Sequence, residues 1–111
     1  MPRDSLAEFE LLVMLAALRL GPDEAYTVSI AADIIERTGR SVRRANVFTT
    51  LQRLETKGLV STRLSDPRDE RGARPRRLVT VAPDGLSAVR AATGAIRSMI
   101  GDLSNVVGEV G

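Results

Sequence analysis

Arginine is concentrated in one stretch of the sequence, RLSDPRDERGARPRRL, which runs from Arg63 to Leu78. Its first fifteen residues contain six arginines, although the formal net charge of the whole chain is only +2. Residues 37–77 together carry a net charge of +8, and the rest of the chain carries −6. A basic segment on an otherwise acidic molecule is typical of a protein that binds a polyanion, and the guanidinium group suits phosphates and guanine edges.

The residues that most enzymes use are missing. The chain contains no cysteine and no histidine, which excludes disulfides, thiol nucleophiles, typical zinc sites and the commonest acid–base residue at neutral pH. The carboxylate pairs Asp23-Glu24 and Asp69-Glu70 fall in expected loops, without a cationic partner or metal-ligand spacing. The sequence therefore predicts a protein that is not an enzyme and that needs no metal or other cofactor.

No apolar run approaches the roughly 20 residues of a membrane-spanning helix. The first residues, MPRDSLAEFE, lack the basic and apolar regions of a signal peptide. We therefore expect a cytoplasmic protein without membrane association, and a length of 111 residues favours one domain.

Two helices are expected in the first forty residues. The first covers residues 5–20, opens with Ser5 and Glu8 at the spacing of a capping box, and is apolar around nearly its whole circumference. Such a helix must be covered on more than one side. The second has Thr27 as its expected N-cap and ends at Gly39.

A third helix is expected from about Val42 to Lys57. One face is apolar and consists of Val47, Phe48, Leu51 and Leu54. The other is polar, and we interpret it as a surface that contacts DNA through Arg43, Arg44, Asn46, Thr49, Thr50 and Arg53. An ordinary solvent-exposed face is the alternative, but such a face normally includes acidic residues, and there are none between Thr38 and Leu54. Asn46 and Arg53 are the candidates for reading bases, because their side chains can form bidentate contacts with adenine and guanine.

The arginine-rich segment lies between two β-branched stretches, LVSTRLS and RRLVTV, and it contains two prolines and a glycine. This pattern predicts a hairpin with a long basic tip. Arg71, directly before Gly72 at the expected tip, and Arg74 and Arg76, which follow it, are the expected phosphate contacts. The alternative is a solvated loop in which Asp66, Asp69 and Glu70 pair locally and leave a net charge of +3.

A fourth helix of about 24 residues is expected from Pro83, which suits the first helical position. Apolar side chains recur along it at alternating spacings of three and four, interrupted by Thr93: Leu86, Val89, Ile96, Ile100, Leu103 and Val107. We interpret this heptad seam as a dimerisation surface, because it is longer than a small domain can cover.

Three helices followed by a hairpin form the order of a winged helix-turn-helix. The expected fold class is therefore mainly α with a small β-hairpin and a long C-terminal dimerisation helix. Residues 1–82 would form a winged-helix DNA-binding domain, and residues 83–111 would form the dimerisation helix of the same compact unit.

Three segments, LAEFELLVMLAAL, VFTTLQRLETKGLV and RRLVTVAPDG, follow the pattern of a known family. Through them the chain resembles the PadR-like transcriptional regulators over residues 6–85. It departs from the usual pattern at Phe48, where the family has tyrosine, and at Thr49, where the family has proline. The resemblance implies a dimeric, repressor-like DNA-binding protein whose terminal helix mediates dimerisation and which in some members responds to a small molecule.

These observations predict a homodimeric repressor that binds a pseudo-palindromic operator in double-stranded DNA. The alternative is a winged-helix interaction module whose basic face binds an acidic protein without reading DNA. The residues that would bind an effector are unknown from the sequence, which has no tryptophan to form the floor of an aromatic pocket.

Overall fold

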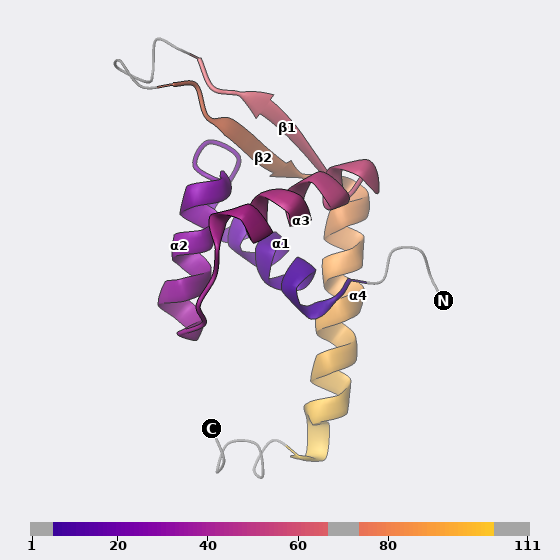
Figure 1. Ribbon diagram of the computed structural model, residues 1–111. Helices are drawn as coiled ribbons and strands as arrows, with labels where there is room; N and C mark the ends of the chain where they lie inside the picture. Colours follow the sequence, from indigo (N-terminus) through magenta and orange to yellow (C-terminus); the bar gives the residue numbers. More distant parts are fainter. Residues whose placement is uncertain (1–5, 67–73, 104–111) are drawn as a thin grey trace.

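The computed structural model describes residues 6–66 and 74–103. Its elements are α1 (Glu8–Leu20), α2 (Thr27–Thr38), α3 (Arg44–Thr56), β1 (Val60–Leu64), β2 (Arg77–Val81), α4 (Pro83–Ile100) and a 3-10 turn, η2 (Gly101–Leu103). In Figure 1, α1 runs through the middle of the molecule, the hairpin lies at one end, and the last turns of α4 extend away from the other helices. The expected fold class, mainly α with one hairpin, is confirmed.

Helix α1 begins differently from the prediction. Ser5 lies outside the described residues, and the N-cap is Ala7, whose backbone N–H donates to the Glu10 carboxylate at 2.9 Å. Glu10, rather than Glu8, therefore satisfies one of the free amides at the start of the helix.

Helix α2 begins at Thr27, and Tyr26 rather than Thr27 occupies the N-cap position. The Ser29 hydroxyl accepts a hydrogen bond from the Tyr26 backbone N–H at 3.0 Å and donates to the Glu24 carbonyl at 2.7 Å. Gly39 ends the helix in the left-handed conformation, with φ of 71°, as the sequence predicted.

The turn from α3 into β1 is a Schellman motif. The Leu59 N–H donates to the Leu54 carbonyl at 2.9 Å, and the Gly58 N–H donates to the Glu55 carbonyl at 3.0 Å. Gly58 has a φ of 77°, a backbone conformation that residues with a Cβ atom rarely adopt. This motif fixes the angle at which the hairpin leaves α3.

The hairpin is antiparallel, with Val60 opposite Val81 and Leu64 opposite Arg77. The Val79 N–H also donates to the Ala25 carbonyl at 2.8 Å, which ties β2 to the loop between α1 and α2. Because Leu78 and Val79 are buried, the base of the hairpin belongs to the core.

The core forms around α1, which contacts α2, α3, α4 and β2. Its largest fully buried side chains are Met14, Ile30, Leu54, Leu59, Val13, Val47 and Val79. Phe48 was expected among them, but 49% of it is exposed, and this part of the prediction is wrong. The rest of the domain covers α1 more completely than expected, since Leu18 is the one large hydrophobic residue of this helix that is exposed.

Helix α4 has 18 residues, ends at Ile100 and is shorter than the 24 residues expected. The helix ends where Gly101, with a non-helical backbone, follows it. Val107 lies outside the described residues. Near its start, Gly85 and Val89 are buried against the domain, so Val89 is a core residue and not part of an open seam.

Candidate nucleic-acid interface

The outer surface of α3 is uncharged along its centre and basic at its beginning. Ala45, Thr49, Gln52 and Thr56 are exposed at helical spacing, opposite the buried Val47, Leu51 and Leu54. Gln52 was not among the predicted contacts, although its spacing of three residues from Thr49 places it on the same face. An amide at this position can pair with adenine in a major groove.

Arg43 and Arg44 are exposed at the N-terminus of α3, where Arg43 is the N-cap residue. Within residues 6–66 and 74–103 neither forms an ion pair. Their charges add to the positive end of the helix dipole. This end of α3 is therefore the part of the helix best suited to a phosphate group.

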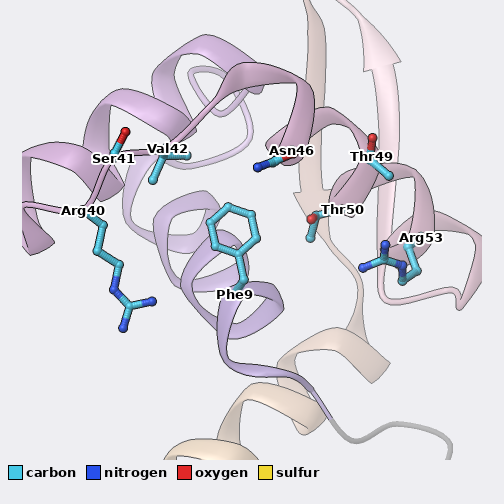
Figure 2. Close-up of a pocket in the computed structure, with 8 residues that line it drawn as sticks. All are labelled: Phe9, Arg40, Ser41, Val42, Asn46, Thr49, Thr50 and Arg53. Carbon is cyan, nitrogen blue, oxygen red and sulfur yellow. The ribbon is translucent and has the colours of Figure 1, made fainter.

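Asn46 and Arg53 lie on the side of α3 that faces α1. They line a cavity of about 400 Å³ together with Phe9, Arg40, Ser41, Val42, Thr49 and Thr50 (Figure 2). Thr50 was predicted to point outward with them, but only 4% of it is exposed, so that prediction is wrong. Thr50 lies where α3 packs against the domain, at the edge of the apolar stripe.

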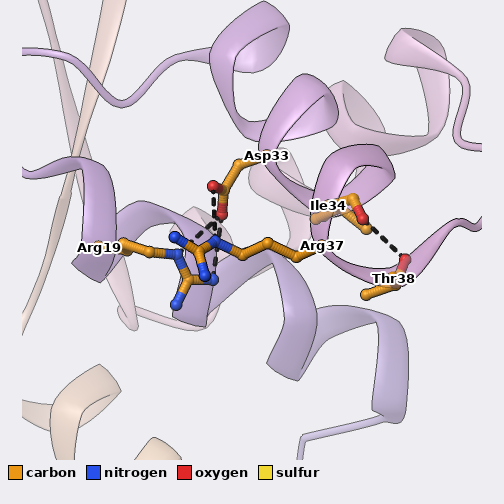
Figure 3. A network of polar contacts seen from close by, with 5 residues as sticks. All are labelled: Arg19, Asp33, Ile34, Arg37 and Thr38. Carbon is orange, nitrogen blue, oxygen red and sulfur yellow. Dashed lines mark hydrogen bonds and ion pairs between the residues drawn. The ribbon is translucent and has the colours of Figure 1, made fainter.

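Away from α3, several basic side chains of the described residues are paired with carboxylates. Arg19 and Arg37 both bind Asp33, at 3.0 and 3.1 Å (Figure 3). Burial raises the pKa of the Asp33 carboxyl, but the hydrogen bonds and charges of the two arginines outweigh burial and lower the pKa overall. These arginines therefore connect α1 to α2, and the Asp33 carboxylate offsets one of their two positive charges.

Two further ion pairs connect α1 to distant parts of the chain. Arg40 donates to both Glu8 oxygens at 2.8 and 3.0 Å, which lowers the pKa of Glu8 and raises that of Arg40. Lys57 binds Glu10 at 3.1 Å. Burial raises the pKa of Glu10, but the hydrogen bonds from Ala7 and Lys57 and nearby positive charges lower it overall.

The hairpin places its arginines in different environments. Arg74 is exposed, whereas the Arg76 guanidinium lies 4.7 Å from the centroid of the Tyr26 ring, in a cation–π contact. Arg63 forms an ion pair with Asp23 at 2.9 Å. Arg71 lies outside the described residues. Of the predicted hairpin contacts, Arg74 and Arg76 are both exposed, and Arg76 also lies against Tyr26 at the N-terminus of α2.

The apolar seam of α4 is covered near the start of the helix and exposed toward its end. Leu86 is partly buried and Val89 is 5% exposed, whereas Ile96 is 49%, Ile100 39% and Leu103 56% exposed. Met99, which the sequence analysis did not single out, is 78% exposed. The described end of α4 therefore presents an uncovered apolar surface.

None of the described helices is long and apolar enough to cross a membrane. In the same part of the chain, no three histidine, cysteine, aspartate or glutamate side chains are grouped as a metal site would require.

Solved structures share this fold. The chain superposes on a PadR-family transcriptional regulator from Eggerthella lenta with a TM-score of 0.66 and 20% identity, over 90% of this chain and 86% of the other. A PadR-like transcription factor from Bacteroides fragilis gives 0.61 and 20%, over 93% and 89%. A structure of Bordetella bronchiseptica BpsR, whose DNA binding is regulated by 6-hydroxynicotinic acid, gives 0.63 and 22%, over 92% and 67%.

No protein-family model matches the sequence, and no curated protein matches it significantly. The structural likeness confirms the fold that the resemblance implied. The chain has the winged-helix architecture of PadR-like transcriptional regulators.

Proposed function

We propose that the protein is a DNA-binding transcriptional regulator, without enzymatic activity, that acts as a homodimeric repressor on a pseudo-palindromic operator. The observation that supports it most is the set of α3 arginines that have no carboxylate partner in the described part of the chain, on a fold shared with transcriptional regulators. A regulator of this kind would work in the cytoplasm.

In this proposal α3 enters the major groove and the hairpin follows the backbone. Arg43 and Arg44 contact phosphates, while Thr49 and Gln52 face base edges from the centre of the exposed surface. Arg53 reaches the groove from the side of α3 that faces α1. Arg74 contributes a further phosphate contact from the hairpin.

The dimer would form through the exposed end of α4. Ile96, Ile100 and Leu103 are between 39% and 56% exposed, so a second copy would remove considerable apolar surface from water. A two-fold axis through this contact would also place two α3 helices about one DNA turn apart, roughly 34 Å.

The alternative is an interaction module whose basic α3 face binds an acidic protein. A gel-shift titration of the full chain with genomic fragments, followed by footprinting, distinguishes the two functions. We expect protection of an inverted repeat and a steep dependence on salt, because phosphate contacts release counterions. Absence of any sequence-selective complex would contradict the proposal.

A matched pair of variants locates the interface. Arg43→Gln with Arg44→Gln should lower the affinity for operator DNA and for random DNA to a similar degree, since both arginines contact phosphates. Arg90→Gln removes an exposed arginine from α4 and should leave binding unchanged. Gln52→Ala should cost about 1–3 kcal/mol on the operator and much less on random DNA.

A small molecule would control this binding, as 6-hydroxynicotinic acid regulates the DNA binding of BpsR. The ligand would act by changing how α3 is presented to DNA. Purified operator complex, challenged with small-molecule extracts of the source cells, tests this part of the proposal.

A further inference from the structure

Phe48 is the one large apolar side chain that α3 exposes, and 49% of it is open to solvent. It lies four residues before Gln52, which is also exposed, so the two side chains are neighbours on the helix surface. The surrounding surface is polar and basic, since no acidic residue lies between Thr38 and Leu54. Phosphate contacts give an aromatic ring at this position no role.

The Phe48 ring borders a small cavity between α3 and the hairpin. The cavity has a volume of about 90 Å³, and its apolar part is formed by Phe48, Leu51 and Val79. Leu51 and Val79 are buried, so they are fixed parts of the core. The volume is far below the roughly 300–1,000 Å³ of small-molecule sites. The cavity therefore fits a single group that projects from a larger molecule, such as a methyl group.

The charged side chains at this cavity neutralise each other. The Thr62 hydroxyl donates to the Glu55 carboxylate at 2.8 Å, and the Arg77 guanidinium donates to the Thr62 hydroxyl at 3.1 Å. Because Glu55 and Arg77 line the same cavity with opposite charges, this end of it does not favour a phosphate. The group that suits the cavity is uncharged and apolar.

Thymine carries such a group in the major groove. Among the four bases of DNA, only thymine presents a methyl group there, on C5, and phenylalanine is one of the side chains that contact it. Cβ atoms four residues apart on a helix are about 5–6 Å apart, and successive bases of one strand are about 3.4 Å apart. If Gln52 contacts an adenine, Phe48 therefore reaches the same base pair or an adjacent one.

We propose that Phe48 determines sequence specificity by binding the C5 methyl group of a thymine at or next to the base pair that Gln52 contacts. This inference rests on the proposed function, because α3 must enter the major groove. The methyl group would lie between the Phe48 ring and the mouth of the cavity. The same contact would favour 5-methylcytosine over cytosine, since the two methyl groups occupy the same position in the groove.

Replacement of thymidine by deoxyuridine tests the contact, because it removes the methyl group and keeps the base pair. The probes are duplexes that the full chain selects from a random-sequence pool, resynthesised with deoxyuridine at one position at a time. At one thymine of each half-site, we expect the Kd in gel-shift titrations to rise about fourfold, the effect of one buried methyl-sized group. A cytosine at that position should bind more tightly when it is methylated on C5.

Variants of Phe48 connect the methyl effect to this side chain. Phe48→Ala should raise the Kd of the thymidine duplex about as much as deoxyuridine does in the wild type, and deoxyuridine should then have no further effect. Phe48→Leu should keep most of the preference for thymidine, because leucine can also pack against a methyl group. Ile35→Ala is the matched control, since Ile35 is 44% exposed but lies on α2. This control should retain the full methyl effect, and circular dichroism of all variants should match the wild type.

The outcomes separate this inference from the proposed function. Equal affinity for thymidine and deoxyuridine duplexes at every position would overturn the inference while sequence-selective binding stands. Equal losses for Phe48→Ala on both duplexes would assign Phe48 to the DNA backbone or to the fold, and would also overturn it. If the chain selects no preferred sequence from the pool, the proposed function fails and this inference fails with it.

Discussion

Gly85 lies in the first turn of α4, where the helix passes directly over the chain that leads into β1. A Cβ atom added at Gly85 would lie 2.0 Å from the Leu59 carbonyl oxygen and 2.8 Å from the Met14 Cε atom. Methionine can rotate away, but the Leu59 oxygen is backbone and accepts a hydrogen bond from Ala82 at 3.0 Å. Gly85→Ala should therefore push the start of α4 away from the hairpin.

The expected size follows from three contributions. Overpacking of a filled interior costs about 1–3 kcal/mol, and weakening the Ala82 hydrogen bond adds about 1 kcal/mol. Alanine gains about 1 kcal/mol over glycine from helix propensity, which offsets part of this loss. We expect Gly85→Ala to lower the free energy of unfolding by about 2 kcal/mol.

Gly94 provides a matched control in the same helix. No atom lies within 4 Å of a Cβ added there. Gly94→Ala should therefore show only the helix-propensity gain, and should raise the free energy of unfolding by up to about 1 kcal/mol. The two substitutions are chemically identical, but they are expected to change the free energy of unfolding in opposite directions.

Urea unfolding followed by circular dichroism measures both variants, and equal slopes would show that the unfolded states are comparable. If Gly85→Ala stabilised the protein as much as Gly94→Ala, the close approach of α4 to Leu59 would be incorrect. The position of the hairpin relative to α4 would then need revision.

Three further predictions concern the surface and the ion pairs. Arg74→Ala should reduce the slope of log affinity against log salt concentration by about one unit in filter-binding titrations, because the variant releases about one counterion fewer on binding. An unchanged slope would show that Arg74 does not contact the DNA. Ile100→Asp with Leu103→Asp should give a monomer mass by light scattering and only non-specific DNA affinity; a dimer with full operator affinity would refute the proposed α4 interface. Because the pKa of Glu10 lies below its usual value of 4.5, its ion pair stabilises the fold above that pH, and this contribution is lost as the pH falls through the lower folded-state pKa. Glu10→Gln should therefore be less stable than the wild type near pH 7, by a margin that shrinks as the pH is lowered below 4.5 in urea titrations, whereas a constant margin would contradict this assignment.

Local signals in the sequence were sufficient for the order of the elements. Gly39 and Gly58 mark turns at which only a positive φ satisfies the last carbonyls of a helix, and both have that conformation. Pro83 correctly marks the start of α4. Such signals act through neighbouring residues, so they can be read without knowledge of the rest of the chain.

The faces of α3 show where periodicity stops being informative. Phe48 and Thr50 lie on either side of the Val47, Leu51 and Leu54 stripe, and hydropathy favoured burial of the phenylalanine. In the structure Thr50 is buried and Phe48 is exposed. The reason is that α1 and its neighbours cover the Thr50 side of α3, while the Phe48 side faces the hairpin across a small cavity of about 90 Å³. Which edge of a stripe is covered depends on what packs against each side.

The candidate site was likewise only partly determined by the sequence. Arginine density and the absence of acidic residues between Thr38 and Leu54 identified the basic surface from the sequence alone. The sequence could not show that Arg40 pairs with Glu8 or that Lys57 pairs with Glu10, because these partners are 32 and 47 residues apart and meet only in the folded chain. The cavity beside Thr50 also exists only after α1 and α3 have packed together, since a cavity is a property of the space between elements.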